Sequence, residues 1–218
     1  MKKLILTAAA TIALSGAAHA ATLTFDEYQH GDVITSVSLG GGITASVSAS
    51  GNSNSSPDQA WVFDTTLSNT QDPDLEGPFT SDGVNYDINT GGALIVQEHN
   101  GAPDDDGRGG IITFVFSQAV SFLGFDFLDD GDVLVRDNND NAVRVGTERG
   151  SDFDNFFTSS GLLNWTNVTE LSFDFGRDSG AIDNLSFEIA PVPLPASLLL
   201  LLAGMGALGF AARGRQTA

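Results

Sequence analysis

The stretch Ile111–Leu128, which reads IITFVFSQAVSFLGFDFL, decides the fold of this chain. Phenylalanine alternates with smaller or polar residues at Phe114 and Phe116 and again at Phe125 and Phe127. A period of two is typical of a strand that buries one face. We therefore expect strands at 111–116 and 120–128, and a core built largely from the 15 phenylalanines of the chain.

Apolar or alternating runs of similar length recur on both sides of this stretch, separated by turns rich in Gly, Asp and Asn. Asp130–Gly131 lies between two such runs and predicts a tight hairpin, and 137–141 predicts a longer one. No segment between the two ends of the chain shows a convincing helical pattern. Short strands at this spacing predict an all-β, antiparallel, jelly-roll-like β-sandwich. The other expected strands are 22–25, 33–38, 43–50, 60–63, 93–97, 133–136, 142–145, 168–175 and 182–189.

The least regular part of the chain is 52–86. Within it, 71–83 forms a long segment rich in Pro, Asp and Gly. A loop of this length in a compact domain is usually functional or mobile.

The N-terminus has the pattern of a secretory signal peptide. Lys2 and Lys3 supply the positive charge, 4–17 is apolar, and Ala18-His19-Ala20 is a small-residue cleavage site. We expect residues 1–20 to be removed before Ala21.

The C-terminus carries a second apolar segment. The tail has a proline motif, an apolar run over 196–212 and two arginines at 213 and 215. Prolines set a sharp start for a helix, about 17 apolar residues are just long enough to cross a bilayer, and arginines favour the cytoplasmic side. We expect one transmembrane helix here, within a tail at 191–218. The proline motif consists of Val192, Pro193, Leu194, Pro195 and Ala196.

This tail resembles the VPLPA-type C-terminal sorting signal, a relative of the PEP-CTERM signal. The resemblance implies a Gram-negative bacterium in which an exosortase-like membrane protease cuts near the motif. The precursor would be anchored in the inner membrane, and the product, 21–190, would reach the cell surface or the medium. It also implies an association with exopolysaccharide.

Composition limits the partners of the exported part. All 28 acidic residues fall between Asp26 and Glu188, against five arginines and no lysine. Such a surface repels nucleic acid and anionic lipid. Aspartate-rich loops suit either solubility in high salt or the binding of Ca²⁺, which prefers carboxylate oxygens. There is no cysteine, so disulfides and cysteine-based metal sites are excluded.

The sequence offers little for catalysis. After removal of the leader, only His30 and His99 remain, and no G-x-S-x-G elbow precedes a helix. Nothing singles out a pair of carboxylates for glycoside hydrolysis. We expect no catalytic residues and no enzyme activity.

The first candidate Ca²⁺ site comes from acidic loops spread over 64–106. The chain carries the successive motifs FD, DPDL, LIVQE and PDDD, followed by a Gly-rich segment that leads into a strand. In these motifs, roughly 60–187 resembles uncharacterised bacterial exported β-sandwich domains. The resemblance implies a fold and an exported location, but no activity. Carboxylates on neighbouring loops repel one another unless a cation lies between them; the alternative is solvated turn aspartates. The matching positions are Asp64, Asp72, Asp74, Glu98, Asp104 and Asp105.

A second candidate Ca²⁺ site joins the two ends of the domain. Asp26 leaves the first expected strand and Asp183 enters the last, and in jelly-roll sandwiches such strands often pair around a structural Ca²⁺; Asp183 could instead cap a turn. A third candidate, 137–148, fits an EF-hand loop at Asp137, Asn139, Asn141 and Glu148. It lacks the glycine at position six and its flanking helices, so we interpret it as a hairpin turn.

Sugar binding needs an exposed aromatic ring. Trp165, in a polar stretch, is the best candidate, whereas Trp61 resembles a core residue. The sequence thus predicts a non-catalytic surface or matrix protein with Ca²⁺ as its one possible cofactor. The alternative is a carbohydrate-binding module that acts on exopolysaccharide.

Overall fold

The computed structural model describes residues 19–78, 80–81, 84–85, 90–129, 131–146, 156–158, 163–189, 200–201 and 203–205. His19–Ile189 forms one compact unit, and the two ends of the chain belong to another. The predicted leader up to residue 18, the proline motif and Glu148 lie outside the described residues.

The unit is almost entirely β. One 3-10 turn, η1 (Pro73–Leu75), interrupts its strands. The strands are β1 (His19–Leu23), β2 (Ser36–Gly40), β3 (Ile43–Gly51), β4 (Ala60–Asp64), β5 (Thr80–Ser81), β6 (Val84–Asn85), β7 (Gly92–Val96), β8 (Gly110–Leu128), β9 (Asp132–Asp137), β10 (Ala142–Gly146), β11 (Phe156–Thr158), β12 (Trp165–Asp174) and β13 (Ala181–Ile189).

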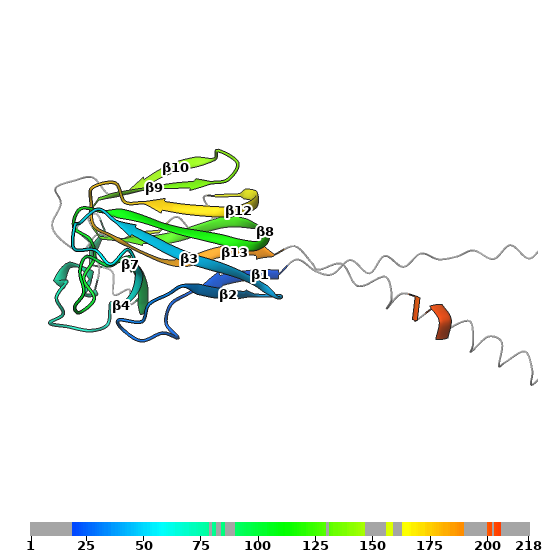
Figure 1. Cartoon of the computed structure of the whole chain (residues 1–218), viewed down its shortest axis with the longest axis horizontal. Helices are drawn as coiled ribbons and strands as arrows, with labels where there is room; N and C mark the ends of the chain where they lie inside the picture. Colours follow the sequence, from blue (N-terminus) through cyan, green and yellow to red (C-terminus); the bar gives the residue numbers. More distant parts are fainter. Residues whose placement is uncertain are drawn as a thin grey trace, which may run out of the picture. The chain divides into compact units, whose positions relative to one another are not determined.

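The long strand β8 organises an 11-stranded antiparallel sheet (Figure 1). Its first half pairs with β3 on one side and with the end of β12 on the other. Its second half pairs with β13, which in turn pairs with β1 and β7. The outer strands β4 and β10 complete the order β10-β9-β12-β8-β13-β7-β4. One strand therefore belongs to both halves of the sheet.

Aromatic rings show that these halves pack face to face. Phe116 of β8 contacts Phe187 of β13 at a centroid distance of 5.4 Å, although neither is the register partner of the other. Phe125 likewise contacts Phe173 of β12 at 5.0 Å. The sheet is thus curled around a phenylalanine core, as in a β-sandwich. Each fully buried phenylalanine contributes about 1.5–3 kcal/mol.

A second, smaller cluster lies on the opposite face of the sheet. Phe63, Ala93, Ile95, Leu128 and Ala181 alternate along their strands with residues of the main core. Leu75 of η1 is fully buried in this cluster, so η1, which lies within the predicted long loop, packs onto the outer face of the sheet.

The structure corrects two predictions. The strands expected at 111–116 and 120–128 form the single strand β8, because the exposed residues 117–119 remain extended while the pairing partner changes. The strands that flank the tight hairpin expected at Asp130–Gly131 do not pair with each other: β9 pairs with β10 and β12, and β12 separates it from β8. Asp130 itself lies outside the described residues. The longer hairpin at 137–141 is confirmed, between β9 and β10.

Little of the predicted transmembrane segment is described. Residues 200–201 and 203–205 are helical, with Leu200, Leu201 and Met205 exposed. Within the described parts of the chain, no helix has the length and apolar character that crossing a membrane requires.

Candidate functional site

Two buried carboxylates meet beside the outer face of the sheet. Asp72 precedes η1 and is 4% exposed, and Asp105, which forms an isolated bridge with Gln97, is 7% exposed. The backbone N–H of Asp105 donates to Oδ2 of Asp72 at 3.2 Å. The N–H of Gly180 donates to Oδ2 of Asp105 at 2.5 Å. Loop 71–78 is thereby joined to the segments before β8 and before β13.

The electrostatics of this pair are unfavourable for two negative charges. Burial raises the pKa of Asp72 to about 9, and the Asp74 carboxyl, in hydrogen-bond contact with it, adds to the rise. Burial also raises the pKa of Asp105 well above its ordinary value, and the charges of Asp72, Asp129 and Asp74 act in the same direction. Backbone N–H groups offset only part of these shifts. In the folded chain both carboxyl groups therefore favour the protonated form.

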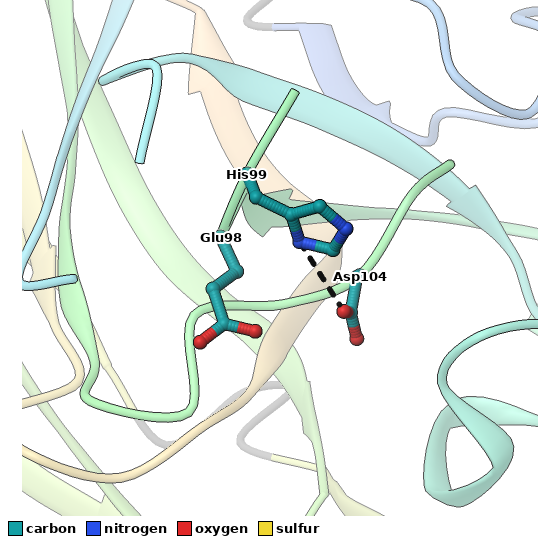
Figure 2. A group of neighbouring side chains, drawn as sticks. All are labelled: Glu98, His99 and Asp104. Atoms are coloured by element: carbon teal, nitrogen blue, oxygen red, sulfur yellow. Dashed lines mark ion pairs between the residues drawn. The ribbon is translucent and has the colours of Figure 1, made fainter. Parts of the chain in front are cut away.

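A half-buried triad lies next to this pair. Possible ligand atoms of Glu98, His99 and Asp104 all lie within 4.8 Å of one another, and this is the one such group found in the described chain. Figure 2 shows the His99 ring directed at Asp104, with Nδ1 and Oδ2 3.5 Å apart. Burial raises the pKa of Asp104, Glu98 and Asp74 add to the rise, and His99 lowers it. Asp74 thus links the triad electrostatically to Asp72 and Asp105.

One buried amide shapes the loop that carries the triad. The Gln97 side chain is fully buried, and its Nε2 donates to the carbonyl oxygens of His99 at 2.8 Å and Ala102 at 2.9 Å. Its Oε1 accepts the N–H of Asp104 at 3.3 Å. The N–H of Glu98 closes the loop on the Asp104 carbonyl oxygen at 3.0 Å. The buried Gln97 side chain therefore fixes the backbone that carries Glu98, His99 and Asp104.

Asp106 is a buried carboxylate whose oxygens have several hydrogen-bond donors. It is 1% exposed, and its oxygens accept the Ser53 N–H at 2.8 Å, the Ser53 hydroxyl at 2.5 Å and the Arg108 N–H at 3.0 Å. Its role is to anchor the 51–56 turn. By comparison, Asp72 and Asp105 each accept one hydrogen bond from a backbone N–H of the described residues.

Asp64, the remaining predicted residue of this group, has a different role. Its Oδ1 accepts the N–H of Thr66 at 2.9 Å in a local turn, and its own N–H donates to Nδ1 of His30 at 3.1 Å. The His30 ring contacts Phe63 at 5.1 Å, and burial lowers the pKa of His30. The structure thus brings together Asp72, Asp74, Asp104 and Asp105, and no described contact joins Asp64 to them.

The structure also brings together Asp26 and Asp183, the predicted second site. Both Asp26 and Asp126 act on the pKa of Asp183, which burial raises to about 8. Asp183 is fully buried, Asp126 is 8% exposed and Asp26 is exposed.

The third predicted site is a self-contained hairpin. The carboxylate of Asp137 accepts the N–H groups of Asn139 and Asn141, each at 2.9 Å, and both side-chain amides. Partial burial raises the pKa of Asp137, but these hydrogen bonds outweigh it and hold the pKa below its ordinary value. The carboxylate is used by its own turn, as the hairpin interpretation predicts.

Trp165 does not form a free aromatic platform. It is half-buried against the main core, with its ring 6.0 Å from that of Phe122. Trp61 is also half-buried, and its Nε1 donates to Oε1 of Gln59 at 3.1 Å.

A polar hollow of about 550 Å³ lies at the start of β8, lined by Asn52, Arg108, Gly176 and Arg177. Nδ2 of Asn52 donates to the carbonyl oxygens of Arg108 at 3.0 Å and Gly176 at 2.7 Å, which joins the two loops. Within the described residues, neither guanidinium has an ion pair. Arg108 and Arg177 thus bring two positively charged side chains to one hollow of a strongly acidic protein.

The sequence reasoning missed Asp126 and Asp129 as members of these acidic groups. Asp126 alternates with Phe125 and Phe127 in β8, as a polar residue of an outer strand face would, and Asp129 directly follows the strand, as a turn residue would. The sequence signal that could have identified Asp126 is its place on the same strand face as Leu128, a residue that the second cluster buries.

Comparison with known proteins identifies the tail alone. Residues 191–216 match the family model for the PEP-CTERM protein-sorting motif. No curated protein matches the chain. The motif marks an exported, cell-surface protein that an exosortase, a membrane protease, recognises and processes.

Proposed function

We propose that this chain is the precursor of a non-catalytic surface or extracellular-matrix protein, whose folded unit is stabilised by Ca²⁺ after export. The sorting motif supports the route, and the curled antiparallel unit between the two ends is consistent with a jelly-roll-like sandwich as the product. The predicted leader, 1–20, and the membrane-anchored precursor stage belong to this proposal.

The observation that carries the Ca²⁺ proposal is the burial of Asp72 against Asp105, with Asp74 and Asp129 as further negative neighbours. The charged groups that act on Asp72 and Asp105 are carboxylates. A divalent cation removes this repulsion, and several oxygen ligands suit Ca²⁺. Asp104 and Glu98 extend the oxygen set. His99 is a poor Ca²⁺ ligand, so Zn²⁺ on the triad is the competing outcome of a metal titration.

Calorimetric titration of the full chain in mild detergent tests this site. We expect Ca²⁺ binding to the wild-type chain and at least a tenfold weaker affinity in Asp72→Asn, which keeps the acceptor for the Asp105 N–H. Asp140→Asn removes one charge from an exposed turn and is the matched control. Equal binding by wild type and Asp72→Asn, or Zn²⁺ binding without Ca²⁺ binding, would contradict the proposal.

The sorting route has its own test. In a host that carries an exosortase, the wild-type chain should reach the surface in a form that lacks the tail. A chain with both Pro193→Ala and Pro195→Ala should accumulate uncut in the membrane fraction. Surface display of the uncut variant at wild-type levels would show that the motif is not needed.

We expect no enzyme activity. In the described residues, Nδ1 of His30 accepts a backbone N–H, and Nδ1 of His99 lies 3.5 Å from Oδ2 of Asp104. A base that activates a nucleophile would also hold a hydroxyl group within hydrogen-bond distance. Neither histidine has such a contact among the described residues. Turnover of a glycan or ester substrate by the purified chain would overturn this statement.

The polar hollow favours a second candidate function, the binding of carboxylate-bearing exopolysaccharide. Arg108 and Arg177 offer paired donors for a uronate, whereas Trp165 has its ring against the core. Binding to an immobilised uronate polymer should be lost in the chain with both Arg108→Ala and Arg177→Ala, and kept in Arg136→Ala, an exposed control. Retained binding in the double variant would remove this alternative.

A further inference from the structure

Asp183 is an unusual carboxylate for a sheet interior. Its side chain is fully buried, and neither oxygen has a hydrogen-bond partner among the described residues. Leaving a buried polar group without a partner costs about 1–3 kcal/mol, and more for a charged group. The site must therefore be protonated or hold something that the protein chain itself does not supply.

A second buried carboxylate lies directly opposite. Asp126 of β8 is the register partner of Asp183 in β13, so the two side chains share one face of the antiparallel pair. Opposed like charges destabilise such a pair. Nδ2 of Asn184 donates to Oδ2 of Asp126 at 2.8 Å, which holds that carboxylate in place. Asn184, with φ of 51°, occupies an irregular point of the ladder between Asp183 and Ser186.

Asp26 adds a third carboxylate from the loop that follows β1. Its Oδ1 accepts the N–H of Gly92 at 3.0 Å, which leaves Oδ2 for another partner. Gly91, with φ of +70°, makes room for it, because a Cβ there would overlap the Asp26 carboxylate. Asp26 is exposed, so it also gives the buried pair a route to solvent.

The charges around Asp183 all have one sign. Burial raises its pKa to about 8, and both Asp26 and Asp126 add to the rise. The nearby N–H groups of Asn184 and Phe25 offset part of it, although neither meets the geometry of a hydrogen bond to the carboxylate.

We propose that Asp183, Asp126 and Asp26 bind a divalent cation of the Ca²⁺ class, separate from the Asp72 group. Three carboxylates without histidine or cysteine form a hard-oxygen set. The three carboxylates come from three segments, and their oxygens do not all lie within 4.8 Å of one another. Ca²⁺ tolerates such a site better than Mg²⁺ does, because its coordination geometry is flexible. The exposed Asp26 is the ligand that closes over the ion.

This cation acts as a clip between the first and last strands of the unit. The predicted leader cleavage before Ala21 falls inside β1, and the part of β1 that remains, Ala21–Leu23, pairs with Leu185–Phe187 of β13. At the other end, the sorting motif match begins at residue 191, soon after β13 ends at Ile189. The site ties the loop after β1 to β13 and β8. Binding of Ca²⁺ after export then fixes the strands next to both processed ends.

Calcium titration of the full chain, read by calorimetry, tests the clip. We expect two bound Ca²⁺ equivalents for wild type and for Asp140→Asn. Asp183→Asn should lose one equivalent and retain the other. In chelator its melting temperature should be equal to or above that of wild type, because a buried charge has been removed.

The outcomes separate this site from the Asp72 group, on which it does not depend. If the Asp72 group binds no ion, wild type binds one equivalent and Asp183→Asn binds none. If Asp183→Asn binds as many ions as wild type, with the same affinity, the clip does not exist and Asp183 is a protonated core residue. Asp26→Asn, an exposed change that keeps the acceptor for Gly92, should weaken one equivalent at least tenfold. Unchanged binding in that variant contradicts the clip even if Asp183→Asn fails to fold.

Discussion

Gln97 shows how one residue prepares the candidate site. Its buried amide makes three hydrogen bonds within the 97–104 loop, and Ala cannot replace any of them. We predict that Gln97→Ala lowers the free energy of unfolding by about 2–4 kcal/mol, because three backbone groups lose their hydrogen-bond partner and a fully buried side chain is truncated. Chemical denaturation measures this loss. Gln118→Ala, whose side chain is exposed and makes no hydrogen bond among the described residues, should change the stability by less than about 0.5 kcal/mol. Equal losses in the two variants would show that Gln97 does not organise the loop.

Asp72 and Asp183 make stability depend on pH when cations are removed. Their folded pKa values, about 9 and about 8, lie above the ordinary 3.8, so the folded chain holds these protons more tightly than the unfolded chain. The stability from this binding is fully present below about pH 4 and is lost as the pH rises through the folded pKa values.

Denaturation in chelator should therefore give a free energy of unfolding that falls between pH 5 and pH 9. Saturating Ca²⁺ should reduce the fall, because the cation replaces the protons, and Asp72→Asn should reduce it in chelator. A stability that is flat or rises over this range would show that these carboxylates are not buried as described.

At the scale of the element, the β9–β10 hairpin tests whether an acidic turn can stabilise the fold without binding an ion. Asp137 makes four hydrogen bonds to Asn139 and Asn141. We predict that Asp137→Ala costs about 1–2 kcal/mol but leaves the number of bound Ca²⁺ ions unchanged. Loss of a bound ion in this variant would restore the EF-hand-like interpretation of 137–148.

The strands also show what the sequence can and cannot predict. Strands such as β3, β4, β9 and β13 were expected within one or two residues of their observed bounds, because alternation is a local property of one exposed and one buried face. Pairing is not local: β12, from later in the chain, lies between β8 and β9 and removes the predicted hairpin.

The acidic residues divide in the same way, into positions that the sequence could group and positions that depend on strand pairing. Asp72, Asp74, Asp104 and Asp105 could be grouped because they stand in loops, where carboxylates are conspicuous. Asp126 could not, because only the register of β8 with β13 places it opposite Asp183.

At the scale of the whole molecule, an excess of negative charge is combined with buried carboxylates that have no basic partner among the groups that shift their pKa values. We therefore expect the protein to be less stable without cations and more stable where Ca²⁺ is available. The sorting motif marks it as an exported protein that an exosortase processes. Export and cation binding would then be successive steps in producing the mature fold.

Thermal melting of the full chain at neutral pH, in chelator and in excess Ca²⁺, tests this account most directly. One site at about 100 times its Kd adds about 2.7 kcal/mol, which for a chain of this size raises Tm by about 5–11 °C. We predict a rise of at least this size in wild type, and a smaller rise in both Asp72→Asn and Asp183→Asn. Superimposable melts of the wild-type chain in chelator and in Ca²⁺ would contradict the account.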